Sequence, residues 1–207
     1  IEIPDFDRIF GRHTPLHVDI GCGKGTFISG VARENPDMDH VGLEMRPHFI
    51  EQLMRVRQQE ELTNLYGVAC NVHFHLDQLF SAGCVQVFYV NFPDPWFKKR
   101  HHKRRVINPE FLQSLADKLV EDGQLLIATD NQELGEYMFE TCEAHPHFVN
   151  QEGAGRFAAD DAMFGPQRSE REAWHLSRNE RIYRIRYRVV PSSPIPEEAP
   201  DNKTANE

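Results

Sequence analysis

The residues with the clearest chemical potential lie between Asn91 and Arg105, in the segment NFPDPWFKKRHHKRR. Six of the last eight residues of this segment are Lys or Arg, although the formal net charge of the whole chain is -9. Such a cluster suits a nucleic acid, because each phosphate that a Lys or Arg neutralises releases condensed counterions. The alternative is a solvated basic turn. We predict that the phosphate backbone of a nucleic acid is contacted by Lys99, Arg100, Lys103, Arg104 and Arg105.

The acidic part of the same segment holds Asp94 between two prolines. It follows an apolar run, Val85 to Phe92, that predicts a buried central strand. Because proline restricts the backbone, Asp94 would be held rigidly at the carboxyl end of this strand, where sites form in open α/β sheets. Asp94 is therefore a candidate catalytic residue, and the alternative is a turn cap. Trp96 and Phe97 either stack on a base or close over the core.

A glycine-rich turn, DIGCGKG, spans Asp19 to Gly25 between an expected strand and an expected helix. Glycines permit positive φ and close backbone approach, so this turn can cradle a nucleotide-like ligand. Its spacing differs from the G-x-G-x-x-G pattern of dinucleotide binding, and Glu44 is placed to accept hydrogen bonds from ribose hydroxyls. A nicotinamide cofactor and S-adenosylmethionine both satisfy this pattern. The carboxylate of Asp19 favours the second, whose amino-acid and sulfonium end is cationic.

Short apolar runs alternate with helical patterns, which predicts an α/β fold with a mostly parallel sheet covered by helices on both faces. Strands are expected at His17–Ile20, His40–Glu44, within Leu65–Leu76, and at Val85–Phe92, Gln124–Thr129, His147–Gln151 and Arg181–Val190. Helices are expected before Pro36, from Pro47, from an N-cap at Asn108 to Leu119, and over Asn131–Ala144. Gly123 is expected to end a helix or form a turn, and Glu152–Arg171 to form a substrate-facing loop.

The length of 207 residues predicts one domain, residues 1–190, followed by a disordered, Pro-rich acidic tail, residues 191–207. The four cysteines form no CxxC pair, so neither a zinc ribbon nor a disulfide scaffold is indicated, and a reducing cytoplasm fits best. No apolar run approaches the roughly 18 residues of a membrane helix. His73 and His75 would share one face of a strand, but with no Cys or carboxylate at ligand spacing we expect no metal.

Five segments together resemble the tRNA (guanine-N7-)-methyltransferases of the bacterial TrmB type. The segments are DIGCGKG, GLEMRP (Gly42–Pro47), NFPDPWFKKRHHKRR, ATD (Ala128–Asp130) and Ser169–Glu172. The resemblance covers roughly Asp5 to Val190. It implies a class I methyltransferase fold, which is Rossmann-like, with S-adenosylmethionine as methyl donor and N7 of a guanosine in the variable loop of tRNA as acceptor.

The resemblance also assigns roles by matching position. It implies a cofactor pocket of Asp19, Gly21, Gly23, Glu44, Arg46, Asn71 and Asp94, with Asp94 shared between cofactor and catalysis. It implies substrate contacts from Lys98, Asp130, Ser169, Glu170, Arg171 and Glu172. The family more often has Asp in place of Asn71 and Thr in place of Ser169, but the amide keeps an acceptor and Ser keeps the hydroxyl.

The expected acceptor determines the chemistry. Guanine N7 has a lone pair and no proton, so positioning and electrostatics must supply most of the acceleration. We expect a negative centre at Asp94 and a positive rim, with some arginines of the C-terminal region on an edge strand. Two other classes stay open: a catalytically inactive methyltransferase fold that binds RNA, and a nicotinamide-dependent enzyme acting on a small substrate. Either a monomer or a homodimer fits.

Overall fold

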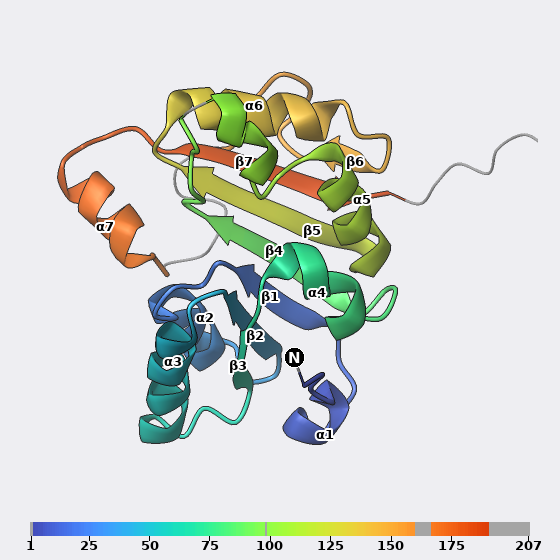
Figure 1. Cartoon of the computed structure of the whole chain (residues 1–207), viewed down its shortest axis with the longest axis vertical. Coiled ribbons are helices and arrows are strands. Elements are labelled where there is room, and N and C mark those ends of the chain that lie inside the picture. The colour runs from blue at the N-terminus through green and yellow to red at the C-terminus, as the bar shows by residue number, and fades with distance from the viewer. Residues whose placement is uncertain (1, 98, 160–166, 191–207) are drawn as a thin grey trace, which may run out of the picture.

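The computed structural model describes residues 2–97, 99–159 and 167–190 (Figure 1). In chain order the elements are α1 (Phe6–Phe10), β1 (Leu16–Ile20), α2 (Thr26–Glu34), β2 (Asp39–Glu44), α3 (Pro47–Gln59), β3 (Leu65–Ala69), α4 (Val72–Leu79), β4 (Val85–Asn91), the 3-10 helix η1 (Lys99–Arg104), α5 (Pro109–Lys118), β5 (Leu119–Thr129), α6 (Gln132–Glu143), β6 (Phe148–Asn150), α7 (Glu170–Ser177) and β7 (Tyr183–Val189). No helix in these ranges combines the length and the apolarity that a bilayer crossing requires. The tail expected at residues 191–207 lies outside the described residues.

The strands form one seven-stranded sheet in the order β3-β2-β1-β4-β5-β7-β6. From β3 to β5 neighbouring strands run parallel, whereas β7 runs antiparallel to both β5 and β6. The predicted α/β fold with a mostly parallel sheet is therefore confirmed. Because parallel strands end on the same side, the segments that follow β1 to β5 meet at one edge, which we call the carboxyl edge.

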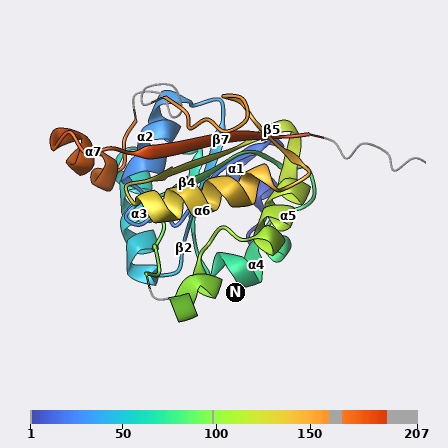
Figure 2. The ribbon, with the colours of Figure 1, turned by 90° about the horizontal axis from the view of Figure 1, so that it is seen from above.

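Helices cover both faces of this sheet, which Figure 2 shows nearly edge-on. On one face α4, α5 and α6 bury side chains such as Leu76, Leu112 and Met138. On the other, α2 and α3 bury Ile28 and Leu53. Fully burying an aliphatic side chain of this size contributes about 1.5 to 3 kcal/mol, so both layers hold the sheet firmly. Covering on both faces also explains why β4 appears in the sequence as one continuous apolar run.

The N-terminus of α5 confirms the predicted cap. The side chain of Asn108 accepts a hydrogen bond from the Phe111 backbone N–H at 2.9 Å, and Pro109 occupies the first helical position. Pro is tolerated there because its missing N–H would have had no partner within the helix.

The third strand lies within the predicted segment, as β3, but the sequence analysis missed the helix α4 that follows it, with Asn71 as the N-cap. His73 and His75 therefore lie two apart on a helix and do not share a face. Within the described ranges, no cluster of three or more His, Cys, Asp or Glu could hold a metal ion.

The fifth strand begins at Leu119 rather than at Gln124. Its pairing with β4 shifts register between the Val85–Leu119 and Val87–Gln124 pairs, so the residues between Leu119 and Gln124 bulge from the ladder. Asp122 lies in this bulge with φ 58°. Gly123 is thus part of a bulged strand, and Leu119 does not belong to the α5 face where the sequence placed it.

The arginine-rich C-terminal strand is not an edge strand, contrary to the prediction. β7 lies between β5 and β6, and Arg184 on it is only 1% exposed. Its guanidinium donates to the Glu172 carboxylate. The segment expected to be a loop up to Arg171 instead ends in α7, which begins at Glu170. A buried ion pair that joins distant parts of the chain therefore accounts for charge that the sequence alone assigned to solvent.

Candidate active site

The predicted site residues of the described chain gather along the carboxyl edge. Asp19 is close to the end of β1 and pairs in register with Gly42 of β2 and Tyr89 of β4. Glu44 ends β2, and Asn91 ends β4. Parallel pairing alone is enough to bring these strand ends together, which is why positions far apart in the sequence can form one site.

The glycine-rich turn after β1 has the expected backbone. Gly21, Gly23 and Gly25 have φ of 77°, 54° and 81°, a region that residues with a Cβ rarely adopt. At Gly25 a Cβ would also lie 2.3 Å from Leu53 of α3. The turn is thus fixed by both backbone conformation and close packing, and the Leu43 carbonyl oxygen holds the backbone N–H groups of Gly21 and Cys22 at 2.8 and 3.0 Å.

Glu44 is the most highly hydrogen-bonded carboxylate of this edge. Its side chain, 6% exposed, accepts from the backbone N–H of Gly23 at 3.2 Å and from that of Arg46 at 3.0 Å. The Arg46 guanidinium, 57% exposed, also donates to it at 2.9 Å. Burial alone would raise the pKa of Glu44, but these bonds and the Arg46 charge hold it below its ordinary value. Glu44 is therefore an ionised acceptor.

Asp19 is buried without a matching cation. It is 1% exposed, and burial raises its pKa to about 7, with the Glu44 carboxylate adding to the rise. The Asn91 amide is close enough to oppose that rise. Within the described chain, however, neither Asp19 Oδ1 nor the side-chain nitrogen and oxygen of Asn91 makes a hydrogen bond. Unsatisfied buried polar atoms are rare, and here they suit a cationic ligand with donors.

Asn71 contributes to the same edge through its capping role. Its side-chain oxygen accepts from the His73 backbone N–H at 3.2 Å and begins α4. The amide is half-buried, and its nitrogen and the second lone pair of its oxygen remain for a ligand.

The loop that carries Asp94 follows β4 and is conformationally unusual. Phe92 and Trp96 have φ of 50° and 47°, which for aromatic side chains is uncommon backbone. Asp94 between them is exposed and makes no hydrogen bond to a described residue. Hydrogen bonding to Glu44 chiefly raises the pKa of Arg46, and the Asp94 charge adds to it. Asp94 thus lies near the Glu44–Arg46 pair while its carboxylate remains accessible.

The predicted substrate residues cluster on and around α7. Ser169 is the N-cap and accepts from the Glu172 backbone N–H at 3.1 Å. Glu170 accepts from Lys24 of the glycine-rich turn at 3.1 Å, and Arg171 donates to Asp130 at 3.0 Å. The Glu172 carboxylate is fully buried against Arg184, so α7 is tied to both the glycine-rich turn and the sheet.

His175 is a member of this cluster that sequence reasoning missed. It is buried, lies 3.3 Å from the Asp130 carboxylate and 2.6 Å from that of Glu180, and stacks on Phe92 with centroids 5.9 Å apart. The signal for it was present, because Ser169 and Glu172 have the S-x-x-E spacing of a capping box. A helix beginning there puts Glu172 and the residue three positions later on one inward face.

The basic run does not act as a single surface. Lys98 lies outside the described residues, as do the side chains of Lys99 and Lys103. Arg100 is exposed, and Arg104 is exposed with its guanidinium 5.2 Å from the centre of the Trp96 ring. Arg105 is only 4% exposed. Its guanidinium is turned into the protein, so we leave Arg105 out of the proposed RNA contacts.

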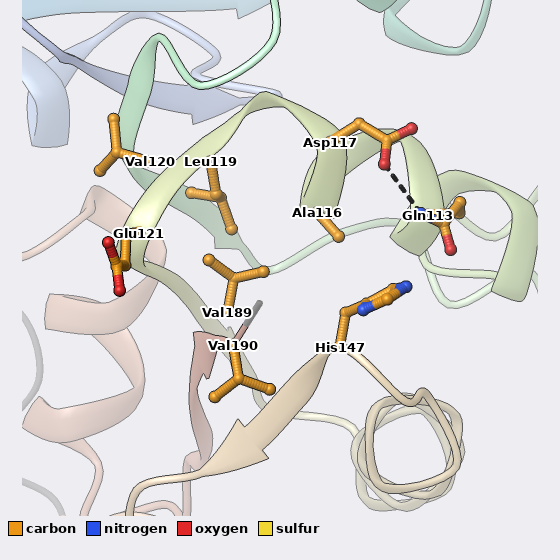
Figure 3. Close-up of a pocket in the computed structure, with 9 residues that line it drawn as sticks. All are labelled: Gln113, Ala116, Asp117, Leu119, Val120, Glu121, His147, Val189 and Val190. Carbon is orange, nitrogen blue, oxygen red and sulfur yellow. Dashed lines mark hydrogen bonds between the residues drawn. The ribbon is translucent and has the colours of Figure 1, made fainter. Parts of the chain in front are cut away.

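A separate hollow lies at the opposite end of the sheet, near the start of β5 and the end of β7 (Figure 3). Two carboxylates and no Lys or Arg are among its lining residues, which are Gln113, Ala116, Asp117, Leu119, Val120, Glu121, His147, Val189 and Val190. None of the predicted site residues lines it. Its position and charge therefore separate it from the carboxyl-edge site.

Solved structures of methyltransferases share this fold. The 16S rRNA methyltransferase KamB aligns over 92% of this chain and 96% of its own, with a TM-score of 0.61 and 16% identity. The antibiotic-resistance methyltransferase Kmr aligns over 91% and 93%, with a TM-score of 0.60 and 15% identity. The fold is that of the class I S-adenosylmethionine-dependent methyltransferases.

Sequence comparisons give the family. The family model described as "Putative methyltransferase" matches residues 13–185. The tRNA (guanine-N(7)-)-methyltransferase of Prochlorococcus marinus is 36% identical over 191 residues, which cover 90% of this chain and 89% of that protein. The protein of the same name from Thermosynechococcus vestitus is 34% identical, covering 90% and 86%. With residues at the carboxyl edge that fit a cationic nucleoside, these matches show that the chain belongs to the tRNA (guanine-N(7)-)-methyltransferase family.

Proposed function

We propose that this chain transfers a methyl group from S-adenosylmethionine to N7 of a guanosine in the variable loop of tRNA, forming 7-methylguanosine. The observation that carries the proposal is the convergence of two buried carboxylates, Asp19 and Glu44, with the proline-bracketed Asp94 at one sheet edge. The first two suit a cationic donor that contains ribose, and the third adjoins the basic turn. Relatives named for this activity match most of the chain.

In the proposed donor pocket, different residues bind different parts of S-adenosylmethionine. Asp19 pairs with the cationic amino-acid end, and Glu44 accepts from ribose hydroxyls, for which it is already ionised. Asn71 offers its amide to the base, and Arg46 keeps the Glu44 carboxylate oriented. Gly21 and Gly23 complete the pocket, because residues without a Cβ let the backbone approach the ligand closely.

Transfer to N7 needs no general base. The donor supplies a methyl group on a sulfonium sulfur, so a bond to N7 forms, the bond to sulfur breaks, and positive charge passes to the guanine ring. The chain must therefore hold the acceptor in line and stabilise that charge. Asp94 is the carboxylate we assign to this, since it is accessible and adjoins the donor side. A preorganised contact of this kind is worth about a hundredfold to a thousandfold in rate.

The acceptor side of the site is proposed to hold tRNA in two ways. The basic turn contacts phosphates through Lys99, Arg100, Lys103 and Arg104. The pocket for the base is shaped by Lys98, Asp130, Ser169, Glu170, Arg171 and Glu172, and Glu172 acts from a buried position through its ion pair to Arg184. Positive charge on the rim thus binds the RNA phosphates, while the negative charge of Asp94 at the centre stabilises the methylated guanine ring.

The direct test is incubation of the purified protein with labelled S-adenosylmethionine and unmodified tRNA, followed by identification of the labelled nucleoside. We expect 7-methylguanosine at a single variable-loop position. Label in another nucleoside would refute the assignment of the acceptor. Binding of tRNA without cofactor binding would instead indicate an inactive methyltransferase fold that binds RNA.

A matched variant tests the donor pocket separately. Glu44→Ala should weaken S-adenosylmethionine binding in calorimetry by about 1.5 to 3 kcal/mol, the typical contribution of hydrogen bonds to a charged group. The affinity for tRNA should be unchanged. An unaltered cofactor affinity would remove Glu44 from the pocket.

A further inference from the structure

The Asp94 loop, residues 92–96, has an uncommon backbone conformation that contacts with other elements must support. Its two ends, Phe92 and Trp96, both have positive φ, and each such residue costs of the order of 1 to 3 kcal/mol. Asp94 makes no hydrogen bond of its own to a described residue. The place of its carboxylate is therefore set entirely by what supports the surrounding backbone.

Arg105 provides such support. Its Nε donates to the carbonyl oxygen of Pro95 at 3.2 Å, immediately after Asp94 in the chain. A second nitrogen of the same guanidinium donates to Glu133 of α6 at 3.0 Å, and the guanidinium carbon lies 4.6 Å from the centre of the Tyr137 ring, also on α6. One buried cation thus fastens the loop to a helix that packs firmly on the sheet.

The geometry suits Arg rather than Lys. A planar guanidinium can donate in two directions and stack on an aromatic ring at once, whereas an ammonium group is a point charge. Arg105 is only 4% exposed, so its guanidinium must find hydrogen-bond acceptors within the protein rather than in water. This combination is unexpected for a side chain in the same run as the exposed Arg100 and Arg104.

We propose that Arg105 is a positioning residue for methyl transfer, holding the Asp94 loop in its reactive place rather than binding RNA. The inference rests on the proposed function. It divides the basic run by role: the exposed cations retain tRNA, and the last arginine sets the geometry of Asp94. Displacement of a catalytic group by about 1 Å can cost up to a hundredfold in rate, so the effect should be large.

The test uses Arg105→Lys in the full chain, with single-turnover methylation measured at saturating tRNA and cofactor. We expect the rate to fall by about 10- to 100-fold, while the dissociation constant for tRNA and its salt dependence stay within about twofold of wild type. Arg100→Ala is the matched control from the same run. It should raise the dissociation constant and flatten its salt dependence, as a lost phosphate contact does.

A double variant decides whether Arg105 acts through Asp94. If it does, Arg105→Lys should cause no further loss of rate in an Asp94→Asn background. A loss equal to the product of the two single effects would overturn the proposal, as would a changed salt dependence like that of Arg100→Ala.

A further single variant, Glu133→Gln, distinguishes an effect on positioning from a loss of folding. The Glu133 side chain is 66% exposed, so this substitution should leave the melting temperature near that of the wild type. It should slow transfer by about 3- to 10-fold, since Arg105 keeps its bond to Pro95. A wild-type rate in this folded variant would contradict the proposal. Failure of the wild-type protein itself to methylate tRNA would instead contradict the proposed function.

Discussion

Replacing Asp19 by Asn should stabilise the cofactor-free protein while destroying cofactor binding. Asp19 is fully buried with an unpaired oxygen, and its pKa is raised from 3.8 to about 7. A carboxyl group whose pKa is raised by folding retains a proton that the unfolded chain releases. Its contribution to stability is therefore complete below about pH 4 and is lost as the pH rises to about 7.

The magnitude follows from linkage. At about 1.4 kcal/mol per pH unit, the folded protein should be less stable by about 4 kcal/mol at pH 8 and by about 1 kcal/mol at pH 4.5 than if this group could not ionise. Asn has nearly the same shape and cannot ionise. Urea unfolding of the cofactor-free protein should thus show Asp19→Asn to be more stable by up to these amounts, with the gain growing by about 3 kcal/mol between the two pH values.

Asp39 offers a matched control. It is also 1% exposed, but its carboxylate accepts from Arg12 at 2.6 Å and from the Thr14 hydroxyl at 2.7 Å. Asp39→Asn should therefore destabilise at pH 8, by about 1 to 3 kcal/mol. Equal stability changes for Asp19→Asn at pH 4.5 and pH 8 would refute the reasoning, because a purely steric effect has no such pH dependence.

Three other predictions use separate measurements. Asp94→Asn should slow single-turnover methylation by about a hundredfold to a thousandfold, while the dissociation constants for tRNA and for S-adenosylmethionine stay within a few fold of the wild-type values. A wild-type rate in this variant would mean that Asp94 has only a structural role. Arg100→Ala should reduce the log-log salt slope of tRNA binding by about 0.7 to 0.9, whereas an unchanged slope would mean that this cation is only solvated. Burial lowers the pKa of both His17 and His40 to about 4, so in the Asp19→Asn background stability should fall by about 1 to 3 kcal/mol per histidine as pH falls from 6.5 to 4. If urea unfolding gives the same free energy of unfolding at pH 6.5 and pH 4, the prediction for the two histidines is wrong.

Much of the fold was predictable from the sequence because its signals are local or periodic. The apolar run of β4 and the capping sequence at Asn108 each depend on residues close together in the chain. The site positions after the strands could be predicted for a related reason: parallel strands place their ends at one edge whatever lies between. That rule alone was enough to predict that Asp19 and Glu44 lie at the same edge of the sheet.

What could not be predicted depends on contacts between distant segments. Nothing in the basic run distinguishes Arg105 from Arg104, and only the position of α6 turns one inward and leaves the other exposed. The alternation of β7 likewise does not reveal that Arg184 meets Glu172. The helix α4 was missed for a different reason, since a short apolar run with two histidines is compatible with a strand as well as a helix.

The strand order has a consequence for how such a molecule can diversify. Apart from Asp94, the groups proposed for the donor lie at or just after the ends of β1, β2 and β3, on one side of the point where the strand order reverses. The groups proposed for the RNA follow β4 and β5 or lie in the segment leading into β7. The two sets thus come from separate stretches of chain, 19–71 and 91–184, which meet near Asp94 and at the ion pair between Lys24 and Glu170. Substitutions at well-separated positions usually have additive effects. The acceptor stretch can therefore change its preferred RNA through many small steps while the donor stretch remains intact.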